Sequence, residues 1–219
     1  MAETTAPSAI SPAEEEAVFY HESALNASWT GARLALGGMS FLFGAFVFAF
    51  FYLKSLNSHN LWYTAGTHPK MWVGTLIMLL VVVSAVLQTV VLQLIKAGNK
   101  AAWQVGAPVA LVLGLAAVAF SIWQLADLAF HPGASGFASV FVGFWPVYLT
   151  IVFCAMVWLE ILIMRIRPIP QISFVEQPPT YAEAFSVQRF QSSLSAFTLT
   201  WNYLAVVAII AWILFYLVH

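Results

Sequence analysis

Hydrophobic positions in this chain fall into five long, almost unbroken runs. They cover about residues 34–53, 72–95, 104–130, 137–164 and 197–218. A helix that crosses the hydrocarbon core of a membrane needs roughly 20 apolar residues, and each run is long enough. None alternates as a strand would, and only helices or closed barrels satisfy their backbone hydrogen bonds in lipid. The pattern therefore predicts an all-α integral membrane protein, a bundle of five transmembrane helices.

The composition agrees with a membrane protein and excludes some partners. Of the 219 residues, 62% are hydrophobic and 8% are charged, whereas a soluble domain carries about 25% charged residues. The formal net charge is −1, with no basic stripe to neutralise phosphates, so we expect no nucleic-acid partner. The single cysteine, Cys154, lies inside an apolar run and rules out a disulfide framework.

Polar sequence lies mainly at the start of the chain and before the fifth run. Residues 1–30 carry Glu14, Glu15 and Glu16 where a secretory signal would carry basic residues. We interpret residues 1–30 as a polar cytoplasmic tail and residues 31–219 as a five-helix membrane domain. Between the fourth and fifth runs, residues 180–191 predict a short helix at the membrane interface.

Basic residues predict the orientation of the bundle. With the N-terminus inside, six of them fall on the cytoplasmic side and two on the other. The cytoplasmic set is Arg33, Lys96, Lys100, Arg165, Arg167 and Arg189, and the other set is Lys54 and Lys70. Because cytoplasmic loops carry an excess of Lys and Arg, this count places the N-terminus in the cytoplasm and the C-terminus outside.

Two further patterns concern helix packing. Gly106, Ala110 and Gly114 recur every four residues in the third run, a spacing that lets another helix approach closely. We favour packing within the chain over a subunit contact for this row. Tryptophans near the ends of runs are expected to act as interfacial anchors, and these are Trp62, Trp72, Trp103 and Trp201.

Cofactor ligands are scarce in the runs. A haem in the membrane needs axial His, Met or Cys on facing helices, but no histidine lies in the interior of a run. The five histidines are His21, His59, His68, His131 and His219. His59 and His68 share a loop without a nearby carboxylate or cysteine, and there is no Cys-His-Met cluster for copper. We therefore expect no haem, copper or other metal, and no active site, on this chain.

Ionisable and amide side chains inside the runs are the candidate functional residues. Gln124 and Asp127 lie three positions apart near the end of the third run, and we treat them as a structural polar pair. Glu160, near the end of the fourth run, is expected to form a buried ion pair with Arg165 or with a base on another chain. Gln88 and Gln124 are expected to hydrogen-bond between helices.

Three blocks of sequence are similar to those of a known family. Residues 41–56, FLFGAFVFAFFYLKSL, are similar to an aromatic-rich FF-x-G-x-F…A-F-Y block. Residues 124–127, QLAD, match Q-x-x-E, and residues 137–141 follow in place of Y-G-S-x-F. Residues 201–207, WNYLAVV, are similar to W-H-F-V-D-V-V. In this order the blocks resemble subunit III of the haem-copper terminal oxidases (cytochrome c oxidase type), in the short form with five helices. The resemblance covers residues 33–219.

The chain also departs from that family. The buried glutamate of the family's first shared helix is replaced by the segment Gly37-Gly38-Met39. Its H-G-L-H motif corresponds to residues 145–148, WPVY, and the His and Asp of its last helix become Asn202 and Ala205. Only Asp127 stands in for a family carboxylate. The resemblance therefore implies no role for this chain in proton uptake.

The resemblance implies a supporting role. In that family, subunit III binds no redox centre, packs beside the catalytic subunit I, holds lipids in a cleft and prolongs the working life of the enzyme. It therefore implies a non-catalytic subunit in the inner (plasma) membrane of a prokaryote. Haem and copper would lie on partner subunits, and membrane phospholipids would bind this chain. Arg33, at the cytoplasmic edge of the first run, is a candidate contact for a lipid phosphate.

Two alternatives remain open at this point. The chain is compatible with a similar accessory subunit of a nitric oxide reductase or a quinol oxidase, because donor and acceptor sites would lie on partners. A different class is a small stand-alone transporter or lipid carrier. That function needs a polar site at the membrane midplane, whereas the centres of the runs are almost entirely Leu, Val, Ala and Phe.

Overall fold

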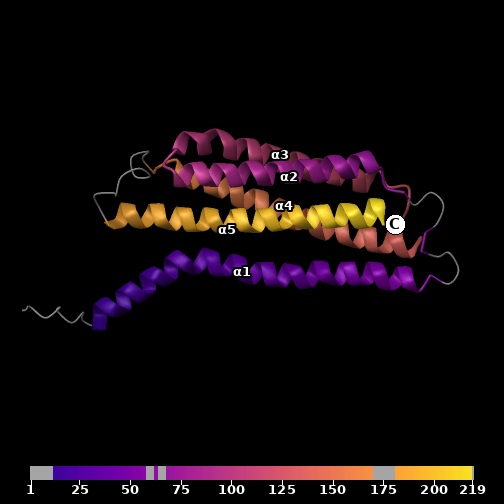
Figure 1. Cartoon of the computed structure of the whole chain (residues 1–219), viewed down its shortest axis with the longest axis horizontal. Helices are drawn as coiled ribbons and strands as arrows, with labels where there is room; N and C mark the ends of the chain where they lie inside the picture. The colour runs from indigo at the N-terminus through magenta and orange to yellow at the C-terminus, as the bar shows by residue number, and fades with distance from the viewer. Residues whose placement is uncertain (1–11, 58–61, 64–67, 170–180, 219) are drawn as a thin grey trace, which may run out of the picture.

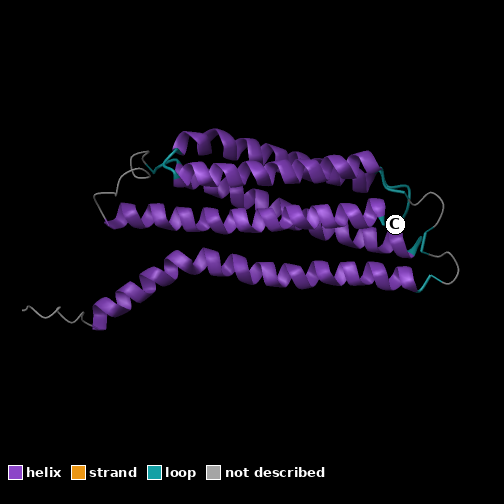
Figure 2. Ribbon diagram, viewed as in Figure 1, coloured by secondary structure: helices purple, strands orange, loops and turns teal. Residues whose placement is uncertain are grey.

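The described part of the chain is made of long helices. The computed structural model describes residues 12–57, 62–63, 68–169 and 181–218, and these ranges contain no strand (Figure 2). The helices are α1 (Pro12–Ser55), α2 (Met71–Lys96), α3 (Lys100–Ala126), α4 (Gly136–Ile166) and α5 (Tyr181–Trp212), and α5 continues into a π-helical segment, η2 (Ile213–Leu217). All five are long and apolar enough to cross a membrane. The predicted helical class and the five long apolar helices are confirmed.

The five helices run side by side along one axis and form a single bundle (Figure 1). Helix α5 lies between α1 and α2, α2 pairs with α3, and α4 packs against α3, α5 and α1. The first turns of α1 bend away from the rest of the bundle (Figure 1). The start of α1 and the end of α5 lie at opposite ends of the bundle, as five helices of alternating direction require.

Helices α1 and α5 run side by side in the same direction. Near their starts, the hydroxyls of Ser28 and Ser193 are 3.0 Å apart. At their far ends, Lys54 donates a hydrogen bond to the backbone carbonyl of Val218. Polar contacts therefore join this parallel pair near both ends and also midway, where the hydroxyls of Ser40 and Tyr203 are 3.1 Å apart. The other side chains that face the space between the two helices are mainly apolar.

The helices differ from the predicted runs mainly at their ends. The third run was expected to reach Phe130, but α3 ends at Ala126 with Asp127 as its C-cap. Phe130 continues the apolar pattern because it is buried in the following loop against Phe137 and Phe141. Hydropathy does not distinguish a buried loop residue from a helical one.

Two helices begin earlier than expected. The segment predicted as a separate interfacial helix is the start of α5, and α1 begins at Pro12, within the predicted polar tail. Ser192 donates a hydrogen bond of 2.7 Å to the carbonyl of Leu25, so the two extensions support each other. Residues 1–11 of the tail lie outside the described residues.

A tight turn joins α2 to α3. Gly98 has φ of +85°, a left-handed conformation that glycine adopts without steric cost. The Gly98 N–H donates to Ile95 and the Asn99 N–H donates to Leu94, at 3.0 and 2.9 Å, which is the Schellman pattern that ends a helix. Asn99 then caps α3, because its side chain accepts from the N–H of Ala102.

The row of small residues on α3 packs inside the chain. A Cβ added at Gly106 would lie 2.3 Å from Cγ2 of Val91 on α2. At Gly114 it would lie 2.0 Å from the sulfur of Met156 on α4, and Ala110 between them is fully buried. The predicted use of this row for intramolecular packing is confirmed.

Aromatic side chains fill the core between α4 and α5. Phe137 and Phe141 stack on each other along α4 with ring centroids 5.9 Å apart, and Phe144 and Tyr148 do the same at 5.7 Å. Phe215, near the end of α5, contacts Phe141 edge-on at 5.2 Å. Such pairs each contribute about 0.5–1.5 kcal/mol beyond the area they bury. The core is therefore held largely by rigid rings.

The prediction that four tryptophans act as interfacial anchors is wrong for three of them. Trp62, Trp103 and Trp201 are buried, and only Trp72 is mainly exposed, at 57%. Trp62 packs edge-on against Phe50 with centroids 4.9 Å apart. These three tryptophans lie near the ends of the runs but belong to the core of the bundle.

The contact between α2 and the end of α5 depends on a glycine. A Cβ added at Gly74 would lie 2.1 Å from Cζ of Tyr216. The ring of Tyr216 is rigid and buried, so it has little freedom to move away.

Gly74→Ala is therefore expected to lower the free energy of unfolding by about 1–3 kcal/mol, the usual cost of overpacking a core. The matched control is Gly37→Ala on α1, where an added Cβ meets nothing within 4 Å. Because alanine has the higher helix propensity, Gly37→Ala is expected to be neutral or to stabilise by up to about 1 kcal/mol. Unfolding of the purified chain in detergent micelles measures both, and equal effects would contradict the contact.

Candidate functional site

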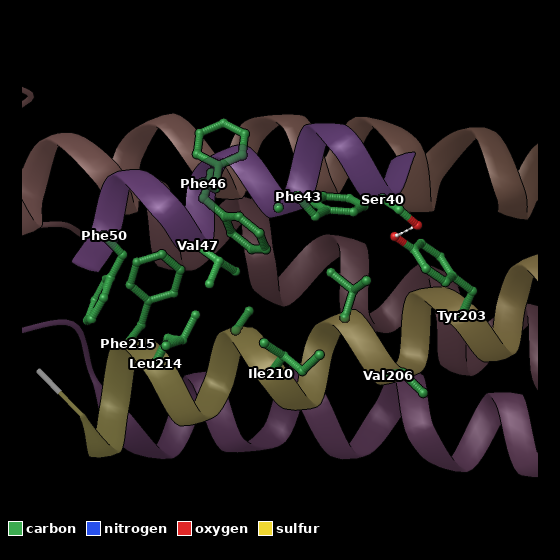
Figure 3. A pocket seen from close by; sticks show the side chains of 14 residues that line it. Ser40, Phe43, Phe46, Val47, Phe50, Tyr203, Val206, Ile210, Leu214 and Phe215 are labelled. Atoms are coloured by element: carbon green, nitrogen blue, oxygen red, sulfur yellow. Dashed lines mark hydrogen bonds between the residues drawn. The ribbon is translucent and has the colours of Figure 1, made fainter. Parts of the chain in front are cut away.

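An apolar cavity lies between the parallel helices α1 and α5 (Figure 3). Its volume is about 210 Å³. Phe43, Phe46 and Phe50 are among the residues that line it from α1, Ile210 lines it from α5 and Leu214 from η2. Figure 3 shows Phe43, Ile210 and Leu214 beside the space between the two ribbons, whereas the ring of Phe46 points away from α5. The cavity can therefore accept an apolar group.

The polar groups in the cavity wall are the hydroxyls of Ser40 and Tyr203, at one end. The two oxygens are 3.1 Å apart, and the Ser40 hydroxyl donates to the carbonyl of Leu36 at 2.8 Å. A serine hydroxyl has one proton, so Tyr203 is the donor between them. Both protons are thus used within the protein, and neither is free to bind a polar ligand.

The cavity extends along about half the thickness of a membrane. Ser40 and Phe50 mark its two ends on α1. Ten residues of helix span roughly 15 Å, half of the roughly 30 Å of a hydrocarbon core. Lys54 follows one turn beyond Phe50, with its Nζ 6.0 Å from the Phe50 ring centroid. A basic group therefore lies beside the Phe50 end of the cavity, close to the C-terminal end of α1.

The structure brings Gln124 and Asp127 to one small cavity but gives them separate partners. This second cavity, of about 80 Å³, lies where α2 begins and α3 ends. Gln124 is buried, and its Nε2 donates to the hydroxyl of Tyr216. Asp127 forms an ion pair with Lys70. The interhelical hydrogen bond expected for Gln124 is confirmed, and its partner is a tyrosine of η2.

The Lys70–Asp127 pair lies at the surface. The two side chains are 53% and 44% exposed, and the Lys70 Nζ also lies 5.7 Å from the ring centroid of Trp123. Exposed ion pairs contribute only about 0–1 kcal/mol. Asp127 therefore forms a weak surface tie between the start of α2 and the end of α3.

The expected buried pair of Glu160 and Arg165 does not form. Both side chains are exposed, and the ion pair found among the described residues is that of Lys70 and Asp127. Five residues along a helix correspond to a rotation of about 140°, whereas facing side chains are three or four residues apart. The spacing itself keeps Arg165 off the face that carries Glu160.

Arg33 lies on α1, away from the apolar cavity. It is exposed, and its guanidinium carbon is 4.8 Å from the ring centroid of Trp29, one turn earlier in the same helix. A cation over an indole face is held there by the charge distribution of the ring. Contact between Arg33 and a lipid phosphate stays a prediction.

Polar side chains also occur at the middle of α2 and α5, where they are used for packing. Trp201 donates to the hydroxyl of Ser84 at 3.1 Å, and Asn202 donates to that of Thr89 at 3.0 Å. The amide of Gln88 is fully buried and has no hydrogen-bond partner among the described residues, so the bond expected for it is wrong. Ser84 and Gln88 are both 0% exposed, which gives a transported solute no access to them.

No cluster of three or more His, Cys, Asp or Glu side chains suited to a metal occurs in the described ranges. His68 hydrogen-bonds the hydroxyl of Tyr63 in the α1–α2 loop, and burial raises the pKa of that tyrosine. His59 and His219 lie outside the described residues.

Neither the comparison with protein-family models nor the comparison with curated proteins gives a match to this sequence. The resemblance to oxidase subunit III therefore rests on the three blocks of residues. Two of these blocks contribute to the apolar cavity: residues 41–56 supply most of its α1 wall, and Tyr203 belongs to the block at residues 201–207.

Sequence reasoning missed the residues that close the cavity. Ser40 and Tyr203 are 163 positions apart, and a single hydroxyl in an apolar run gives no sign of its partner. The aromatic block of residues 41–56 was the available signal, since it placed bulky rings along one stretch of α1.

The buried Gln124–Tyr216 hydrogen bond and the exposed Lys70–Asp127 ion pair are expected to contribute differently to the free energy of unfolding. Tyr216→Phe leaves the buried amide of Gln124 without its partner, and we expect a loss of about 1–3 kcal/mol in unfolding free energy. Asp127→Asn, at the exposed pair, is expected to cost less than about 1 kcal/mol. Unfolding in detergent micelles compares them, and the reverse order would show that the surface pair is the more important tie.

Proposed function

We propose that this chain is a non-catalytic subunit of a respiratory haem-copper oxidase, of the subunit III type in its short five-helix form. It spans the inner membrane of a prokaryote with its N-terminus in the cytoplasm, and it packs beside the catalytic subunit. Haem and copper belong to that partner. The chain contributes a phospholipid site and mechanical support.

The observation that carries this proposal is the apolar cavity between α1 and α5. Its walls are mainly Phe, Val, Ile and Leu side chains, and its two hydroxyls are already hydrogen-bonded within the protein. An acyl chain is the ligand that suits such a space, because it needs dispersion contacts and no hydrogen bonds. A lipid-holding subunit is the role that the resemblance implies.

The cavity also fits one orientation of a phospholipid. With the N-terminus in the cytoplasm, the end at Phe50 faces the outer surface and the end at Ser40 lies near the midplane. A lipid of the outer leaflet would place its acyl chain along the cavity and its phosphate near Lys54. The charge of Lys54 favours a phosphate at that level.

The loose packing of α1 supports exchange of such a lipid with the membrane. Only 11% of the apolar stretch of α1 is buried inside the chain, against 33% to 50% for the other four helices. Helix α1 is joined to α5 near its start, at Ser40 and at its end, and the length between Ser40 and Lys54 borders the cavity. A site with this form holds one acyl chain and remains open to the surrounding lipid.

The proposed assembly predicts the result of a mild purification. We expect the chain to be recovered from detergent-solubilised membranes together with a haem-bearing polypeptide. Haem in the complex is measured by a reduced-minus-oxidised spectrum, and the accompanying chains by mass spectrometry. The isolated chain is expected to show no haem absorption. Recovery without any haem-bearing polypeptide would count against the oxidase role.

The lipid site predicts a specific defect when the cavity is filled. Gly44 lines the cavity and an added Cβ there meets nothing within 4 Å, so Gly44→Leu places a side chain in the space of the acyl chain. We expect this variant complex to lose bound phospholipid and to inactivate sooner during turnover, with an unchanged initial rate. Native mass spectrometry counts the lipids.

Gly37→Leu is the matched control for that experiment. Gly37 lies on the same helix, is equally open, and does not line the cavity. The control is expected to keep its lipid and its working life. If Gly44→Leu retained the same lipids as the control, the cavity would have no role in lipid binding.

A further inference from the structure

Helix α4 presents an outward stripe of side chains that no part of the described chain covers. Phe153, Val157, Ile161 and Met164 are 50%, 42%, 45% and 50% exposed, and Glu160 lies exposed among them. These five residues, called the α4 stripe below, repeat at intervals of three and four and so share one face of the helix. In the proposed membrane orientation this face meets lipid or a neighbouring protein.

Glu160 has no partner for its charge in the described chain. It takes part in no ion pair there, and Arg165 is directed elsewhere by its spacing. The residue one turn further on, where a basic side chain would face Glu160, is Met164. The carboxylate is therefore surrounded by apolar side chains of its own face.

The direction of the side chain makes this isolation more costly. Glu160 lies six residues before the end of α4 at Ile166, about 9 Å inside the helix end. Side chains on a helix lean toward its N-terminus, which for α4 means toward the centre of the membrane. Glu160 is thus directed away from the cytoplasmic surface, so its short side chain is poorly placed to reach water there.

An ionised carboxylate facing hydrocarbon is expensive, and such groups are normally paired. We propose that the α4 stripe is the docking face for a transmembrane helix of a different protein, which places a Lys or Arg side chain against Glu160. The inference rests on the proposed membrane insertion and holds whether or not the partner carries haem.

The shape of the stripe suits a helix. Phe153, Val157 and Ile161 are spaced by four and form one ridge, and Glu160 with Met164 forms the start of a parallel one. A ridge of a second helix packs into the groove between two such rows. The apolar members would supply close contact around the ion pair and exclude lipid from it.

A second copy of this chain does not satisfy Glu160. Copies inserted with the same topology are related by an axis along the membrane normal, so the two Glu160 carboxylates would lie at the same depth on the same face. Like charges close together in a medium of low dielectric constant repel strongly. Charge complementarity therefore favours a different chain with a basic residue at this depth.

The test uses a photo-reactive amino acid introduced at Val157 in cells that make the protein. After irradiation of intact membranes, we expect a cross-link to one different membrane protein, with the linked peptide in an apolar segment that contains Lys or Arg. Val112, on the outer face of α3, is 65% exposed and serves as the matched control position. We expect little protein cross-linking there.

Glu160→Leu is expected to lower the yield of that cross-link about tenfold or more, because it leaves the partner's base without its counter-charge. The stability of the isolated variant in detergent should stay unchanged, since Glu160 has no partner to lose within the described chain. Met164→Lys should act in the same way, because it gives Glu160 a basic neighbour four residues on. Met164→Leu should keep the cross-link.

Three results would overturn the proposal: a yield at Val157 no higher than at Val112, a product consisting of two copies of this chain, or a cross-link unaffected by Glu160→Leu. A separate control concerns the membrane itself. If an alkaline wash released the chain from membranes, the proposed insertion would fail, and this failure is distinct from loss of the partner.

Discussion

The fit of α5 against its neighbours is the contact on which the rest of the structure depends. Its final turns reach three parts of the bundle: the ring of Tyr216 lies over Gly74 of α2, and Phe215 packs against Phe50 of α1 and Phe141 of α4. Rigid rings at van der Waals distance tolerate little displacement, because packing in a protein interior leaves no room for it. This contact also places the hydroxyl of Tyr216 beside Gln124 of α3, so four helices are positioned from one end of α5.

The same arrangement explains the apolar cavity. Helix α1 is joined to α5 by serine hydroxyls near its start, by the Ser40–Tyr203 hydrogen bond and by Lys54 at its end. A smaller share of its apolar stretch is buried than in the other helices. A helix held near both ends and lined with large rings leaves space along its length. Because the two hydroxyls in that space are bonded within the protein, the remaining surface has only dispersion contacts to give. The proposed lipid site is therefore a consequence of how α1 is attached.

Polar side chains in the bundle divide into two groups with different meanings. Gln124 and Trp201 find hydrogen-bond partners on neighbouring helices, so they hold this chain together. Glu160 lies on an outer face and finds none in the described chain. Since a charge in an apolar surrounding is stabilised by a partner, the first group holds the fold together and the second marks the docking face proposed above. The proposed accessory role joins both, as a self-contained bundle that offers one charged face to another protein.

The sequence by itself determined the helical class, the number of long apolar helices and the presence of a small-residue row, because these follow from hydropathy and residue size along a single segment. Tertiary structure alone decided which residues meet. It buried Trp62, Trp103 and Trp201, which their positions had suggested as surface anchors, and it left Gln88 without a partner.

The tertiary structure also brought Ser40 next to Tyr203 and so formed the candidate site. The aromatic block on α1 was visible beforehand, but the cavity was not, because a cavity is a property of two surfaces. Hydropathy records how each residue interacts with solvent, whereas pairing and burial depend on which helix lies opposite, and that information is not contained in any one run.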